Sequence, residues 1–160
     1  MRGIYAVAFT GYSINNADGI QDLFEIQPAA DRPIELVGFK FSQRTDFGDS
    51  EEEGLPVNVI RGNLVIGSGG SAVTPRPLDP RDSAAGFTAV RGNTTPASTG
   101  VEHLLDAESW NIRQTILNMP VPEARGKADN LAANRILVVR LLVAPNSDIV
   151  TEGTAWVREL

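Results

Sequence analysis

The chain has one histidine, His103, and any acid–base or nucleophilic chemistry would have to begin there. Glu102 and Asp106 lie close to it in the sequence, so a carboxylate is available to orient the imidazole. A nucleophilic triad also needs an activated hydroxyl or thiol beside the base. There is no cysteine, and no serine stands in a Gly-x-Ser-x-Gly elbow. We therefore predict a surface or interface histidine and a protein that is not an enzyme.

The densest group of carboxylates lies in residues 46–53, where five of eight residues are acidic. Oxygen ligands at short spacing around a glycine are the donors that calcium prefers. The spacing does not match an EF-hand loop, because the alternating ligands and the terminal glutamate are out of register. We favour a solvated acidic loop between two strands. The alternative is an acidic patch, with Asp49 and Glu52, that meets the arginines of a neighbouring protein. No metal or other cofactor is predicted.

A glycine-rich run, residues 67–71, opens a long segment without hydrophobic periodicity that ends at Gly86. Phosphate binding would require Gly-Lys-Ser/Thr at the start of a helix, but Ala-Val-Thr-Pro follows instead. We predict a flexible joint followed by an extended arm, residues 67–86, that cannot pair in a sheet and lies along another protein. The candidate contacts in this arm are Gly67, Gly70, Pro75, Arg76, Pro77 and Arg81.

Composition predicts one globular domain over residues 1–160. The hydrophobic fraction is 42%, the charged fraction is 21%, and the length is enough for one core. A net charge of -6 argues against binding to nucleic acid or to an anionic membrane surface. The chain has 14 basic residues, of which only Lys40 and Lys127 are lysines. Arginine suits protein interfaces, although genomic base composition explains this bias equally well.

Strand patterns dominate the sequence. Alternating or continuous apolar runs predict eight or nine strands, at residues 4–9, 22–26, 34–41, 57–66 with a bulge at Gly62, 86–90, 110–117, 135–144 and 153–159. The run 135–144 is nearly all apolar and is expected to be a central strand. Residues 99–109 fit a helix or a strand. The N-terminal run alternates, which indicates a first strand and not a signal peptide.

The fold expected is an all-β antiparallel sandwich, jelly-roll-like, with a long extended loop. Trp110 and Trp156 are expected in the core, with an interface anchor as the alternative.

The order of these features resembles that of small head proteins of tailed bacteriophages. The resemblance covers nearly the whole chain and is carried by strand 22–26, residues 28–35, the acidic loop, Arg61-Gly62, residues 67–70 with the proline arm, 110–113, 120–123 and Arg158-Glu159. Such decoration, or cement, proteins bind the outside of an icosahedral shell. The resemblance implies a β-sandwich, often jelly-roll-like, assembled as trimers where shell subunits meet. It supplies no catalytic residue.

The function expected from these features is a homotrimer that binds the major capsid protein on the capsid exterior, after assembly in the host cytoplasm. The alternative is a carbohydrate- or protein-binding jelly-roll module elsewhere on a virion. A carbohydrate site would need an exposed aromatic platform, for which Tyr12 or Trp110 is the candidate. A cupin-type enzyme ranks last, because its metal site needs several histidines and the chain has one.

Overall fold

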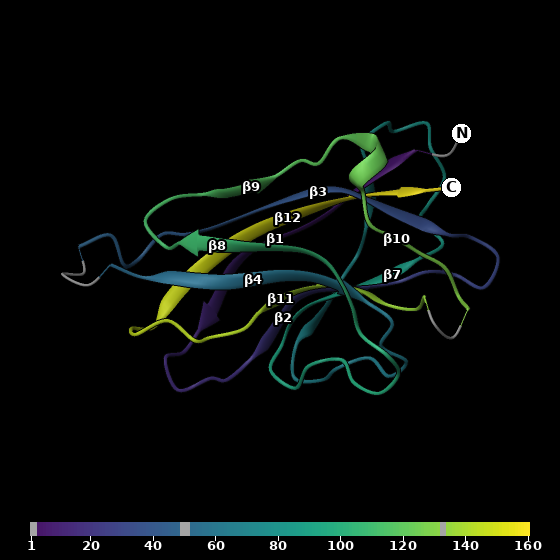
Figure 1. The fold of residues 1–160 in the computed structure, drawn as a ribbon. Helices are drawn as coiled ribbons and strands as arrows, with labels where there is room; N and C mark the ends of the chain where they lie inside the picture. The colour runs from purple at the N-terminus through teal and green to yellow at the C-terminus, as the bar shows by residue number, and fades with distance from the viewer. Residues whose placement is uncertain (1–2, 49–51, 132–133) are drawn as a thin grey trace.

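Two antiparallel β-sheets pack face to face in the computed structural model, which describes residues 3–48, 52–131 and 134–160 (Figure 1). Sheet A has the order β10 (Lys127–Ala128), β3 (Ile34–Gln43), β12 (Ile149–Glu159), β1 (Ile4–Ile14) and β6 (Arg76–Pro77), and β9 (Ile116–Asn118) also pairs with β3. Sheet B has the order β5 (Ser71–Val73), β7 (Thr88–Asn93), β2 (Gln21–Gln27), β11 (Leu137–Leu141), β4 (Gly54–Arg61) and β8 (His103–Asn111). This arrangement confirms the all-β antiparallel sandwich. The jelly-roll topology stays a prediction.

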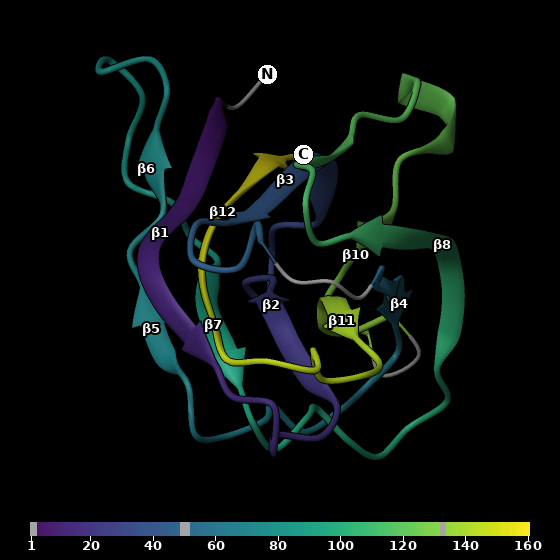
Figure 2. The ribbon, with the colours of Figure 1, turned by 90° about the vertical axis from the view of Figure 1, so that its left-hand side faces the viewer.

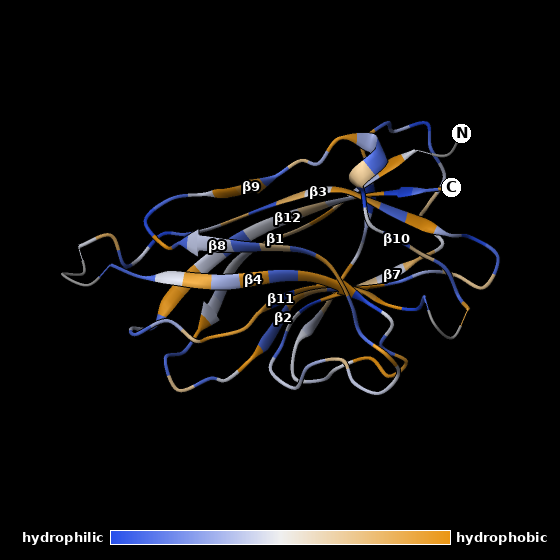
Figure 3. Cartoon of the chain, viewed as in Figure 1, coloured by the Kyte–Doolittle hydropathy of each residue, from blue (hydrophilic) through white to orange (hydrophobic). Residues whose placement is uncertain are grey.

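The core lies between the sheets and is built from alternate residues of the long strands. In β12 every second residue is buried, as a period of two requires. Aromatic rings fill the centre: Phe41 packs edge-on against Trp110 with ring centroids 4.8 Å apart, and Phe9 contacts Phe24 at 5.4 Å. The hydropathy colouring shows mostly apolar residues along β11 and apolar residues interrupted by polar ones along β4 (Figure 3).

Strand β11 is the clearest agreement between the sequence pattern and the structure. All five of its residues are buried, and it lies between β2 and β4 in the middle of sheet B. A strand covered on both faces takes apolar residues at most positions, which explains the nearly continuous run. Arg140 is the exception, and its guanidinium is paired with the buried Asp22. Residues 99–109, which fit a helix or a strand, contribute most of strand β8.

Several strand predictions were wrong in extent: the first strand runs on to Ile14, the last begins at Ile149, and two predicted strands are divided in the structure. Strand β4 ends before Gly62, whose φ of 109° lies in the left-handed region and whose N–H donates to Arg135 O at 2.8 Å. Residues 63–66 therefore form a loop and do not continue the strand. The run 110–117 is also divided: Gln114 N–H donates to Asn111 O at 2.9 Å and closes a turn between β8 and β9.

The two sides of the sandwich are closed by segments that pass from one sheet to the other. On one side, residues 71–77 run from β5 at the edge of sheet B to β6 at the edge of sheet A. On the other side, residues 103–118 run from β8 in sheet B to β9 in sheet A. Figure 2 shows β1, β5, β6 and β7 on one side of the molecule and β4 and β8 on the opposite side. No helix in the described ranges is long and apolar enough to span a bilayer.

Candidate interaction surfaces

The arm, residues 67–86, begins as a firmly attached segment and not as a free joint. Gly67 N–H donates to Glu25 Oε2 at 2.9 Å, and Gly70 N–H donates to Asn93 Oδ1 at 3.0 Å. A Cβ at Gly67 would lie 2.2 Å from Thr95 O, and one at Gly70 would lie 2.2 Å from Arg91 O. These glycines are required by close packing against the neighbouring backbone, which differs from the flexible joint expected.

The prediction that the arm cannot pair in a sheet is wrong. Ser71–Val73 pairs with β7, and Arg76–Pro77 pairs with β1 through Tyr5 and Ala6. Both pieces are short edge strands, where a proline's missing N–H does not interrupt a ladder. Pro77 has that position in β6, and Pro75 lies in the connection between the two pieces. The arm therefore lies along its own sandwich for its first half.

The second half of the arm projects as a loop beside the N-terminus (Figure 2). Leu78 is 57% exposed, and the Arg81 guanidinium is paired with Asp79 Oδ2 at 2.7 Å in a solvent-exposed contact. The loop is fastened again at its end, where Glu159 Oε1 accepts hydrogen bonds from Gly86 N–H and from Phe87 N–H. The result is an exposed tip held at both ends.

The described residues of the acidic loop, 46–48 and 52–53, lie at the end of the molecule opposite the arm tip (Figure 1). Glu52 is exposed, and Asp49 lies outside the described residues. Glu53 is buried, and it accepts a hydrogen bond from Asn146 N–H at 2.6 Å. This residue therefore anchors the end of the loop to the segment before β12. The structure thus separates the predicted site residues: Gly67 and Gly70 lie against sheet B, Arg76 and Arg81 lie near the N-terminus, and Glu52 lies at the far end.

The single histidine and the aromatic residues are placed by the two sheets. His103 is exposed at the start of β8, as predicted for a surface histidine. Trp110 is 1% exposed and donates its Nε1–H to Gln114 O at 2.7 Å, which confirms the core role. Tyr12 is also buried, so neither ring forms the exposed platform of the carbohydrate alternative. Trp156 is only partly buried, with Lys40 Nζ 5.8 Å from its ring centroid.

A buried ionic cluster that the sequence analysis missed lies under the loops covering sheet B. Arg140 Nε donates to Asp22 Oδ1 at 2.6 Å, and Arg140 Nη1 donates to Glu102 Oε1 at 2.7 Å. Ala97 N–H donates to the other Asp22 oxygen at 2.7 Å. These bonds fasten residues 94–102 to β2 and β11. The signal in the sequence was charge inside an apolar strand, because Arg140 interrupts the run of β11.

Glu25 belongs to the same cluster and has an unusual protonation equilibrium. Its side chain is fully buried, and burial together with the nearby Asp22 carboxyl raises its pKa from 4.5 to about 7. Its Oε2 accepts the Gly67 N–H, while Oε1 has no hydrogen-bond partner among the described atoms. The protonation state of Glu25 therefore acts on the first backbone contact of the arm, the hydrogen bond from Gly67 N–H.

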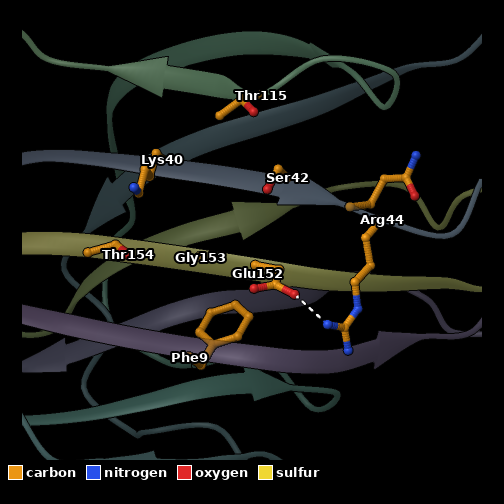
Figure 4. Close-up of a pocket in the computed structure, with 9 residues that line it drawn as sticks. Phe9, Lys40, Ser42, Arg44, Thr115, Glu152, Gly153 and Thr154 are labelled. Carbon is orange, nitrogen blue, oxygen red and sulfur yellow. Dashed lines mark ion pairs between the residues drawn. The ribbon is translucent and has the colours of Figure 1, made fainter. Parts of the chain in front are cut away.

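The outer face of sheet A carries a shallow pocket of about 390 Å³, lined by side chains of β1, β3 and β12 and by Thr115 (Figure 4). Arg44 Nη1 and Glu152 Oε1 are 3.0 Å apart, and Thr10 Oγ1 donates to Glu152 Oε2 at 2.9 Å. The charges in the pocket are therefore largely paired. In the described part of the chain no group of three or more His, Asp or Glu side chains is placed to hold a metal ion.

Comparisons with known proteins give no relative. No family model, no curated protein and no solved structure matches the chain.

Proposed function

We propose that this chain is a non-enzymatic structural protein that binds the outer surface of a bacteriophage capsid as a trimer and stabilises the shell. The proposal starts from the resemblance in strand order and loop chemistry described above. The sandwich is consistent with it, because two packed sheets provide a rigid body that can present loops to a partner.

The observation that carries the proposal is the arm. Its base is bonded to both sheets and its end is bonded to Glu159, while the tip with Leu78 and Arg81 projects into solvent. A contact segment fixed before binding loses less conformational entropy when it docks. A tip that exposes an apolar side chain and an arginine three residues apart is also a favourable composition for a contact with another protein.

The energetic reason for such a role is preferential binding to the assembled state. A protein that binds the complete lattice better than free subunits stabilises the lattice by mass action. A trimer would engage several shell subunits at once, so that contacts of modest affinity combine through effective concentration.

Binding to shells tests the proposal. Purified protein is mixed with undecorated shells of candidate phages and sedimented, and wild-type protein is expected in the pellet at saturating stoichiometry. The tip variant Leu78→Ser/Arg81→Glu is expected to bind at least about tenfold more weakly, because each 1.4 kcal/mol of lost contact is a factor of ten. The control is Lys127→Glu, a charge reversal at an exposed residue of β10.

Two outcomes would contradict the proposed function or the role of the arm in it. If wild-type protein stays in the supernatant with every shell tested, the capsid role is wrong. If the tip variant binds as strongly as Lys127→Glu, the arm is not the contact.

A further inference from the structure

The two sides of the sandwich differ in charge. Strands β8 and β9 contain Asp106 and Glu108 and no lysine or arginine. The turn between them adds Arg113, and β10, which pairs with the same edge of β3 as β9 does, adds Lys127 farther along that edge. Strands β1, β5, β6 and β7, on the opposite side, contain Arg76 and Arg91 and no carboxylate. We call the first side the acidic edge and the second the basic edge.

Asp106 and Glu108 of the acidic edge are exposed and have no cationic partner among the described residues. Asn118 Nδ2 donates to Asp106 Oδ2 at 2.7 Å and to Glu108 Oε2 at 3.2 Å, which orients both carboxylates but neutralises neither. Within the described ranges neither carboxylate forms an ion pair. Strand β8 is also the last strand of sheet B, so no further strand of the described residues pairs with its outer edge. Ala107 N–H donates to Asp106 Oδ1 at 2.9 Å, and Asn111 O accepts the Gln114 N–H, so these two backbone groups already have partners. An exposed edge of nine residues is a template for another strand.

The basic edge is open in a comparable way. β6 pairs with only Tyr5 and Ala6 of β1, and in the part of the chain that the structure describes no strand pairs with the outer edge of β1 beyond Ala6. Arg76 is exposed on β6. Arg91 lies over the Tyr12 ring, with 4.7 Å from the guanidinium carbon to the ring centroid, and adds a second positive charge to this side.

Exposed apolar side chains accompany the charges on both edges. Leu104 of β8 and Leu117 of β9 are each 60% exposed, and Leu78 follows β6 on the basic side. Each edge therefore combines a strand edge without a partner strand in the described residues, strand charges of one sign and apolar surface, and the charges of the two sets of strands are complementary. Charges of the other sign lie only outside those strands, at Arg113 and Lys127 on the acidic side and at Asp79 and Asp82 on the basic side.

We propose that copies of this chain associate head to tail, with the acidic edge of one copy against the basic edge of the next. Two acidic edges would repel each other, as would two basic edges, so a two-fold contact of like edges is disfavoured. A contact between unlike surfaces repeats around an axis and closes into a ring when the rotation allows. The head-to-tail contact stands without the proposed function. Only the expectation that three copies form the ring rests on it.

The contact is tested by exchanging the charges of two exposed residues, Glu108 on the acidic edge and Arg76 on the basic edge. Glu108→Arg and Arg76→Glu each place like charges at the interface, and each is expected to weaken assembly at least about tenfold, which corresponds to 1.4 kcal/mol. The combined variant Glu108→Arg/Arg76→Glu restores opposite charges across a head-to-tail contact and is expected to assemble nearly as wild type does. Glu52→Lys, a charge reversal at an exposed residue outside both edges, is the control. The readout is native mass by sedimentation across a concentration series, with far-UV circular dichroism to confirm folding.

Each result decides the proposal. A wild-type monomer at all concentrations overturns it, as do single variants that assemble like wild type or a folded double variant that stays monomeric. If wild-type association is absent but a basic peptide or a shell protein binds at β8, the acidic edge takes a different partner and the head-to-tail contact is wrong. Shell binding by a monomer would overturn the contact and the trimer but leave the capsid role, whereas a ring that binds no shell would overturn the capsid role alone.

Discussion

Glu25 shows how a single buried carboxyl makes this fold sensitive to pH. Its folded pKa of about 7 lies above the ordinary 4.5, so the folded protein binds the proton more tightly than the unfolded chain does. The resulting stabilisation is complete below pH 4.5 and is lost progressively as the pH rises toward 7. In the deprotonated form the buried charge lies near Asp22, whose own charge is shared with Arg140.

We expect Glu25→Gln to remove this pH dependence. A glutamine resembles the protonated glutamate, because its carbonyl accepts the Gly67 N–H and its amide can donate toward Asp22. Wild-type protein should lose roughly 1 kcal/mol of unfolding free energy per pH unit across this window through Glu25, and the variant should not. Denaturant unfolding at several pH values measures the difference. The exposed Glu52→Gln is the control, and a Glu25→Gln protein with the wild-type slope would refute the assignment.

At the scale of elements, the arm depends on close contact between backbone segments. Residues 62–70 and 94–102 pair with each other through isolated bridges, Val65 with Ser98 and Ser68 with Thr95, and Glu25 receives the Gly67 N–H beneath them. Gly67 fits because it has no side chain.

Gly67→Ala is therefore expected to destabilise the protein by about 1–3 kcal/mol, the usual cost of forcing extra volume into a packed site. Its Cβ would lie 2.4 Å from Glu25 Oε1 as well as against the Thr95 carbonyl. Gly19→Ala, with nothing within 4 Å of the new methyl group, is the matched control. Chemical denaturation compares the two, and equal stability would mean that the loop moves freely enough to accept the methyl group.

The strands that the sequence predicted well are those whose pattern is set by burial alone. β11 and β12 have apolar patterns that only one arrangement explains, continuous for a central strand and alternating for a strand with one solvated face. The arm was mispredicted because two short edge strands need no apolar period. The ionic cluster was missed because Asp22 and Glu25 look like the solvated face of an alternating strand. Only the folded chain shows that residues 62–70 and 94–102 cover that face.

At the scale of the whole molecule, the opposite charges of the two edges make the two sides of the sandwich electrostatically different. The chain carries a net charge of -6, so copies repel one another at long range and association requires a local match of unlike surfaces. The acidic and basic edges supply that match, because each lacks charges of the other sign within its strands.

Salt should therefore dissociate the assembly. The Debye length falls from about 10 Å at 0.1 M to about 3 Å at 1 M ionic strength, which screens exposed charges across an interface. We expect the dissociation constant of wild-type protein to rise with sodium chloride in sedimentation experiments. The neutral variant Glu108→Gln/Arg76→Gln should associate more weakly at low salt and show a smaller salt dependence, because it retains the apolar and backbone contacts but loses the charge pair. Association that strengthens with salt in wild-type protein would mean that apolar contacts hold the copies together and that the charged edges face solvent.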